Sequence, residues 1–312
     1  MLMQFIGYTP LPVRWPFTLD VVARGIRIVE TPNFQEIDWR TRNLRWREEG
    51  ALARSHWLRI NRTCEAQERI YVLDEMAYTL RTAMLAFQLW APKGWDGLII
   101  LTQPDGRVED VCIPEAYPDS KWGRIIDVRK LVPTDLALLV EGTLHAFETK
   151  IVQVVNPFEF LEIGLQTAMH HQRAGALLWI LGLDGLLAAE KQRLFVARLV
   201  RLLGKETRVF PRDWIDREPI YTVADVAEKI FAWRGLVAHG KEILKKFREP
   251  LQVEFQPDEL QNSKIENWTE ETLIVESALF CLIASLRKVI QSDLMPLMSN
   301  KRRWERWLDV ES

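Results

Sequence analysis

Arg234 and His239 are the two residues of this sequence whose types and spacing could do chemistry. They lie in the stretch AEKIFAWRGLVAHGKEIL, residues 227–244, with four residues between them and Gly240 directly after. A guanidinium binds phosphate oxygens through paired hydrogen bonds and keeps its charge, while an imidazole exchanges protons near neutral pH. The pair is therefore suited to breaking a phosphodiester bond, such as that of RNA attacked by its own 2′-hydroxyl.

The spacing of Arg234 and His239 leaves two difficulties and one plainer interpretation. One histidine does not easily perform both proton transfers, and residues five apart on a helix point about 140° apart. Both difficulties ease if the helix ends between the two residues, or if two chains pair so that two such sets face one cleft. In the plainer interpretation, Gly240 ends a helix and the two side chains only complement its dipole.

The elements expected around this pair are mainly α-helical. Apolar periodicity predicts a helix over residues 65–90, and a turn at Pro104-Asp105-Gly106 predicts a hairpin over about 97–113. After Pro133 the patterns predict helices over 156–189 (one long or two abutting, capped by Asn156), up to Gly204, from Thr222 to Gly240, and from Thr269 onward. We expect two domains, 1–132 and 133–312, because the composition shifts near Pro133.

The first sixty residues are expected to be irregular, because four prolines interrupt them. Residues 38–62 contain seven arginines interspersed with three tryptophans. Arg42, Arg45 and Trp46 are candidate RNA-binding residues, since guanidinium groups bind phosphates and indole rings stack on bases. The alternative is an amphipathic helix whose tryptophans pack inward and whose arginines face water.

Two further charged residues lie close to predicted helix ends. Asp184 stands in a long apolar run, where a charge needs a partner, so it either orients Arg234 or His239 or is exposed at a helix end. Arg198 is a candidate phosphate contact, and its alternative is a surface arginine. The adjacent His170 and His171 lack a second ligand at helical spacing, so no metal or other cofactor is expected.

Composition and charge restrict the class of protein. The net charge is −2, so a polyanion would have to meet a local basic surface. The three cysteines are far apart and form no CxxC, which fits a reducing compartment. The longest apolar run, residues 174–189, is too short to span a bilayer comfortably, and the first residues are unlike a signal peptide. A cytoplasmic protein is expected.

Three pieces of the C-terminal half carry a resemblance to a known family. They are LDGLL at 183–187, RLLG at 201–204, and the Arg234-to-Gly240 helix end with Arg-x4-His-Gly. Their types, order and spacing resemble the Apea-like branch of the HEPN superfamily, over roughly residues 133–287. Two positions depart from the family pattern: Gly235 stands where a polar residue usually follows the Arg, and Asp184 stands in place of Glu.

The resemblance implies a helical bundle that often dimerises and often acts as a metal-independent endoribonuclease, linked to defence or toxin–antitoxin biology. Arg234 and His239 match the family's catalytic pair, and Asp184 its acidic residue. RNA is then the expected partner, a homodimer with a composite site the expected assembly, and a protein partner or activator is expected at the N-terminal region. The alternatives are a non-catalytic HEPN module that binds RNA or protein, and a nucleotide-sensing regulatory domain.

Overall fold

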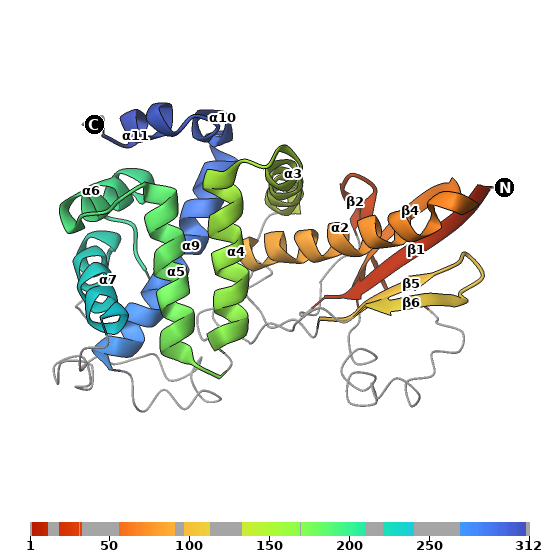
Figure 1. The fold of residues 1–312 in the computed structure, drawn as a ribbon, viewed down its shortest axis with the longest axis horizontal. Helices are drawn as coiled ribbons and strands as arrows, with labels where there is room; N and C mark the ends of the chain where they lie inside the picture. The colour runs from red at the N-terminus through yellow and green to blue at the C-terminus, as the bar shows by residue number, and fades with distance from the viewer. Residues whose placement is uncertain are drawn as a thin grey trace. The chain divides into compact units, whose positions relative to one another are not determined.

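An antiparallel sheet near the N-terminus and a bundle of helices after it make up two units, Met1–Glu148 and Thr149–Ser312. In the computed structural model, residues 2–11, 19–30, 32, 56–90, 97–112, 133–168, 170–209, 221–239 and 269–309 are described. Most of these residues are helical, as the sequence predicts (Figure 1). The sheet, however, is larger than the single predicted hairpin.

The sheet of the first unit has six strands in the order β2-β3-β4-β1-β5-β6, and all pairs are antiparallel. The strands are β1 (Leu2–Pro10), β2 (Leu19–Ala23), β3 (Ile26–Glu30), β4 (His56–Glu65), β5 (Ile99–Thr102) and β6 (Val108–Cys112). Strand β1 pairs with β4 along its whole length, from Leu2 opposite Glu65 to Pro10 opposite Trp57. The predicted hairpin is confirmed as β5 and β6.

The helix α2 (Arg69–Trp90) packs on this sheet and confirms the helix predicted over 65–90. Its second half is buried almost all round, which explains the continuous run of apolar residues there. Gly7 on β1 allows the close approach, because a Cβ there would lie 3.0 Å from the Leu80 side chain of α2. Figure 1 shows α2 running along the strands.

The prediction of an irregular first sixty residues is wrong for the described part of them, which forms β1, β2, β3 and the start of β4. Strand β1 tolerates Pro10 because this residue ends the strand, where the missing N–H removes little of the ladder. The end of the Arg/Trp-rich stretch forms β4 rather than a helix, with Leu58 and Ile60 fully buried, Arg59 half-buried and Asn61 exposed. Alternation with period two, and not helical spacing, therefore sets the faces of residues 58–61.

The helix α3 (Pro133–Thr149) belongs with the first unit, so the units divide after Glu148 and not at Pro133. Arg24 forms ion pairs with Glu141 and Glu148, and the rings of Tyr78 and Phe147 meet edge to face at 6.3 Å. A composition shift marks where a helix begins, whereas these contacts decide which core the helix joins.

The second unit is a helical bundle around one central helix. Its helices are α4 (Val152–Ala168), α5 (Gln172–Leu187), α6 (Gln192–Leu203), α7 (Val223–Ala238), α9 (Glu270–Gln291), α10 (Met295–Met298) and α11 (Lys301–Asp309). Helix α9 contacts α4, α5, α6 and α7 and is buried over most of residues 273–290 (Figure 1). The predicted caps Thr222 and Thr269 each accept a hydrogen bond from the third residue of the helix that follows.

Helices α4 and α5 form the tightest pair of the bundle and settle the choice between one long helix and two. Gly164 and Gly175 allow this approach, since a Cβ on Gly164 would lie 2.3 Å from Trp179 Nε1. The predicted cap at Asn156 is wrong, because α4 begins at Val152 and contains Pro157. Burial of Val154, Pro157 and Phe158 offsets the hydrogen bond that Pro157 cannot donate.

Candidate functional site

Helix α7 carries Arg234 and is fixed at its start by a capping box. Thr222 Oγ1 accepts a hydrogen bond from the Asp225 amide, and the Thr222 amide donates to Asp225 Oδ2 at 2.7 Å. The apolar positions of α7, with Trp233 the largest, turn into the bundle. Arg234 follows Trp233 directly, so it emerges at the edge of the buried face, with its side chain 26% exposed.

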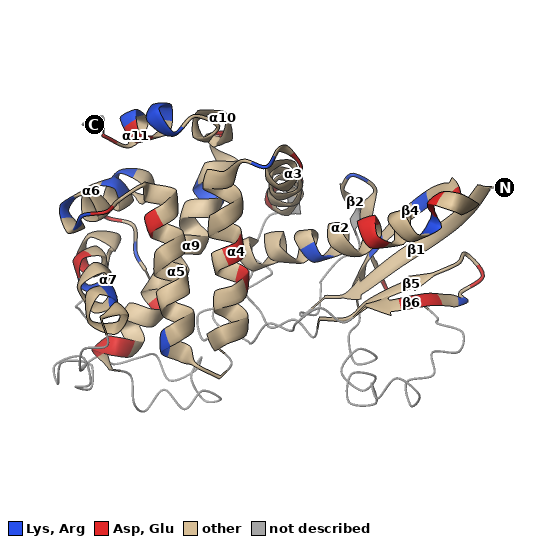
Figure 2. Cartoon of the chain, in the orientation of Figure 1, with Lys and Arg blue, Asp and Glu red and all other residues tan. Residues whose placement is uncertain are grey.

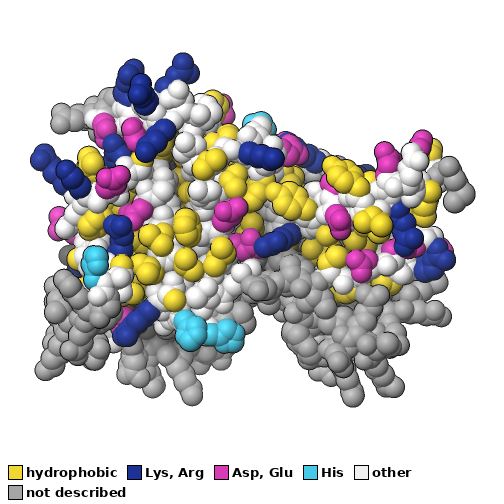
Figure 3. Space-filling view, in the orientation of Figure 1, with side chains coloured by type: hydrophobic (Ala, Val, Ile, Leu, Met, Phe, Trp, Pro, Cys, Tyr) yellow, Lys and Arg dark blue, Asp and Glu magenta, His cyan; other side chains and the backbone are white. Residues whose placement is uncertain are grey.

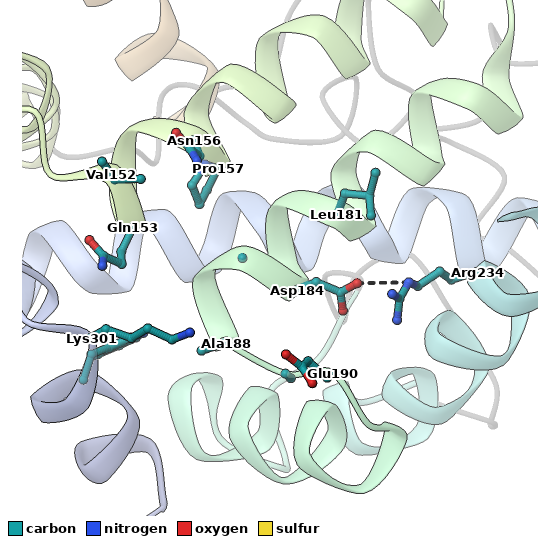
Figure 4. A pocket seen from close by; sticks show the side chains of 13 residues that line it. Val152, Gln153, Asn156, Pro157, Leu181, Asp184, Ala188, Glu190, Arg234 and Lys301 are labelled. Atoms are coloured by element: carbon teal, nitrogen blue, oxygen red, sulfur yellow. Dashed lines mark ion pairs between the residues drawn. The ribbon is translucent and has the colours of Figure 1, made fainter.

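Arg234 forms an ion pair with Asp184 of the neighbouring helix α5. The Arg234 Nε atom lies 3.0 Å from Asp184 Oδ2 (Figure 4). The guanidinium carbon lies 5.0 Å from the centre of the Phe231 ring. The carboxylate and the ring therefore hold the guanidinium from two sides. Of the two interpretations of Asp184, pairing with Arg234 is the one that the structure shows.

Asp184 is an unusual carboxylate, because its surroundings disfavour its charge. Its side chain is 13% exposed, and among the described residues neither oxygen accepts a hydrogen bond of good geometry. Burial raises the pKa of Asp184 from 3.8 to about 6, although the nearby Arg234 guanidinium opposes this rise. A carboxyl with this pKa changes its charge close to neutral pH and so can weaken or strengthen its hold on Arg234.

Asp184 and Arg234 line a pocket of about 510 Å³ on the second unit. The first turn of α4 supplies Val152, Gln153 and Asn156, and the end of α5 and the residues after it supply Ala188 and Glu190. Lys301, the first residue of α11, reaches the pocket from the side opposite Arg234 (Figure 4). Two cations, Arg234 and Lys301, and two carboxylates, Asp184 and Glu190, thus line a space within the range of small-molecule pockets.

His239 does not join this pocket. Helix α7 ends at Ala238, directly before His239, which is its C-cap with φ −96° and ψ 10°. The side chain of His239 is exposed and is not part of the pocket lining. The end of the helix at this point therefore does not bring His239 to the pocket of Arg234, and the pairing of two chains remains as the way to bring both residues to one cleft.

Arg198 has a structural role instead of the predicted phosphate contact. It is buried on α6, and its Nε and Nη2 atoms each donate to Asp309 of α11 at 2.8 Å. Its Nη1 donates to the carbonyl oxygens of Leu187 and Ala188 at the end of α5. One side chain thus caps α5 and ties α11 to α6, and its donors are already used inside the protein.

The remaining predicted site residues, Arg42, Arg45 and Trp46, lie outside the described residues. Two charged residues of the pocket, Lys301 and Glu190, were not predicted as site residues from the sequence. Lys301 opens the basic stretch KRRWERW, which was noticeable by composition. Its distance along the chain from Arg234 gave no sign that the two share a pocket.

In comparisons with known proteins, no protein-family model, curated protein or solved structure matches this chain. Within the described ranges, no helix is both long enough and apolar enough to cross a membrane. The same residues contain no group of three or more His, Cys, Asp or Glu side chains placed to hold a metal ion.

Proposed function

We propose that the second unit is a HEPN-type endoribonuclease of the Apea-like branch, which cuts RNA without a metal and serves in defence or toxin–antitoxin function. The observation that carries this proposal is the ion pair between Arg234 and Asp184 at the edge of a pocket. The family resemblance assigns both residues to the catalytic set from sequence patterns on two different helices. That these two residues touch supports the assignment, since fifty residues of chain separate them.

In this proposal Arg234 holds the scissile phosphate. Its Nε faces Asp184, and no other ion pair within the described residues engages its guanidinium, so the Nη nitrogens are available for phosphate oxygens. Asp184 keeps the guanidinium in one orientation, which lowers the entropy lost when the phosphate binds. The 2′-hydroxyl attacks the phosphorus, the 5′-oxygen leaves, and the products end in a 2′,3′-cyclic phosphate and a 5′-hydroxyl.

His239 moves the protons in this proposal, and a homodimer brings it to the phosphate. Because His239 lies outside the pocket of its own chain, a second chain has to complete the site. The outward face of α4 and α5 supports such pairing, as Ile163 is 47% exposed and Leu177, Leu178 and Leu181 are only half-buried. Figure 3 shows hydrophobic side chains gathered over these helices. Two Arg-His sets facing one cleft would supply both an acid and a base.

The test is cleavage of mixed RNA by the purified full chain in EDTA, beside His239→Ala. We expect cleavage by the wild type to yield cyclic phosphate ends and the variant to be slower by about 10²–10⁴-fold, the usual contribution of acid–base catalysis. His170→Ala is the matched control, because His170 is also an exposed histidine of the second unit. Equal cleavage by wild type and His239→Ala would remove His239 from the mechanism.

A non-catalytic HEPN module that binds RNA or a protein partner is the second candidate, and Gly235 favours it. This residue replaces the polar side chain usual after the motif Arg, although a Cβ there would meet nothing within 4 Å. Packing therefore does not demand glycine, and Gly235→Asn should fold. RNA binding without turnover by the wild type, with turnover gained in Gly235→Asn, would establish this second candidate.

The cellular location of the protein and the partner of its first unit are also proposals. We infer a cytoplasmic protein, where RNA substrates are met. For the first unit we infer a protein partner or activator, and two side chains support this: Ile70 and Tyr71 at the start of α2 are 77% and 76% exposed.

A further inference from the structure

The C-terminal helix α11 presents a row of cations on a rigid support. Lys301, Arg302, Arg303 and Arg306 are exposed, while Trp304 and Leu308 of the same helix are buried against the bundle. Figure 2 shows basic residues along α11 and at both ends of α6, and Figure 3 shows their side chains projecting from this end of the unit. The chain as a whole has a net charge of −2, so this positive surface is local.

Helix α11 is held in place by buried polar contacts. Trp304 Nε1 donates to the Leu186 carbonyl oxygen at 2.6 Å, and Asp309 receives the paired hydrogen bonds of Arg198. The apolar side of α11 therefore packs against the bundle, and only its charged side is exposed to a binding partner. A helix that enters a membrane surface needs its apolar side outward, so this arrangement disfavours a lipid partner.

Among the described residues, no acid forms an ion pair with most of the cations on this surface. Of the two acids on α11, Glu305 lies 3.7 Å from Lys301 and Asp309 is held by Arg198. No ion pair to a described acid engages Arg302, Arg303 or Arg306. These three guanidinium groups can therefore bind phosphates without first breaking an ion pair.

Helix α6 extends the same surface. The guanidinium carbon of Arg201 lies 5.4 Å from the centre of the Trp307 ring, which itself stacks on Trp304 with centroids 5.1 Å apart. The Nε of Arg201 has no hydrogen-bond partner among the described residues. This Nε is also buried, so a phosphate would meet the other nitrogens of the guanidinium, which the Trp307 ring holds in place.

The basic surface is continuous with the pocket of Arg234. Lys301 and Trp304 belong to α11 and also line that pocket (Figure 4). We propose that single-stranded RNA binds along α11 and α6, with its phosphates on Arg302, Arg303, Arg306 and Arg201, and enters the pocket past Lys301. This proposal takes its ligand from the proposed ribonuclease function. A single strand fits because its backbone can bend into a pocket, which a duplex cannot.

The test measures binding of a fluorescent single-stranded RNA by anisotropy in the His239→Ala background, which prevents cleavage. The variant changes Arg302, Arg303 and Arg306 to Gln, and the control changes Arg27, Arg59 and Arg107 of the first unit to Gln. Each phosphate contact contributes about 0.7 to the slope of log K against log salt for single strands, so three should lower the slope by about 2. We expect the α11 variant to bind at least about tenfold more weakly at low salt and the control to bind as before.

Each outcome distinguishes this proposal from the proposed function. If RNA binding depends on α11 but the wild type never cleaves RNA, the proposed RNA-binding surface is supported and only the ribonuclease proposal fails. Cleavage with an unchanged KM, when the three α11 substitutions are made in a protein that keeps His239, overturns the surface and leaves the ribonuclease proposal standing. Equal weakening by the control, or binding of phosphatidylserine vesicles in place of RNA, overturns the proposal as well.

Discussion

Replacement of Asp184 by asparagine should make the folded protein more stable at neutral pH while it weakens the site. Asp184 is 13% exposed, and burial raises its pKa from 3.8 to about 6 even beside Arg234. The ionised carboxylate is thus disfavoured in the folded state relative to the unfolded chain. A difference of about two pH units corresponds to about 3 kcal/mol, at about 1.4 kcal/mol for each unit.

The sign follows from proton binding. Between about pH 4 and pH 6 the folded protein binds more protons at Asp184 than the unfolded chain does, so stability falls as the pH rises through this window. Below pH 4 the carboxyl is protonated in both states, and above pH 6 the full loss is present. Asparagine resembles the protonated carboxyl, so it should match the wild type at pH 4 and exceed its free energy of unfolding by up to about 3 kcal/mol at pH 7.

The assay is urea unfolding of both proteins from pH 4 to pH 8, followed by circular dichroism of the helices. Asp74→Asn is the control, since Asp74 is an exposed carboxylate on α2. RNA cleavage measured in parallel should fall, because Arg234 loses the charge that orients it. A difference between Asp184→Asn and wild type that does not change with pH, or an asparagine variant less stable at pH 7, would refute the reasoning.

Two further predictions concern the packing that positions the site. Gly164→Ala should lower the free energy of unfolding by about 1–3 kcal/mol, because the new Cβ would lie 2.3 Å from Trp179 Nε1. Gly185→Ala is the control and should leave the stability unchanged, because a Cβ there would meet nothing within 4 Å. Thermal unfolding of both variants compares them. Arg198→Gln should cost about 2–4 kcal/mol and release α11, since it removes the hydrogen bonds to Asp309 and to the end of α5. Hydrogen exchange should show faster exchange over α11, and unchanged protection there would contradict this role.

Local rules made several elements predictable from the sequence. Thr222 and Thr269 begin helices because their side chains accept the orphan amides of the first turn, and Gly204 ends one because it adopts a positive φ of 89°. The hairpin of β5 and β6 follows from its turn residues, and α2 from its helical periodicity. These signals lie within a few residues of one another, so tertiary contacts did not have to be known.

The sequence also nominated Arg234, His239 and Asp184, but only tertiary structure decides how they meet. Asp184 could pair or be exposed by sequence alone, and the packing of α5 against α7 places it 3.0 Å from Arg234. From the sequence, Arg198 could be a surface arginine, yet it is buried and bonds to α5 and α11, which gives it a structural role. The strand β4 forms by pairing with β1, and Lys301 lines the pocket beside residues of α4, α5 and α7; in both cases the neighbours lie far away along the chain. Sequence thus determined the residue types and the local elements, whereas long-range packing set burial, pKa and neighbours, because these depend on groups that no short window contains.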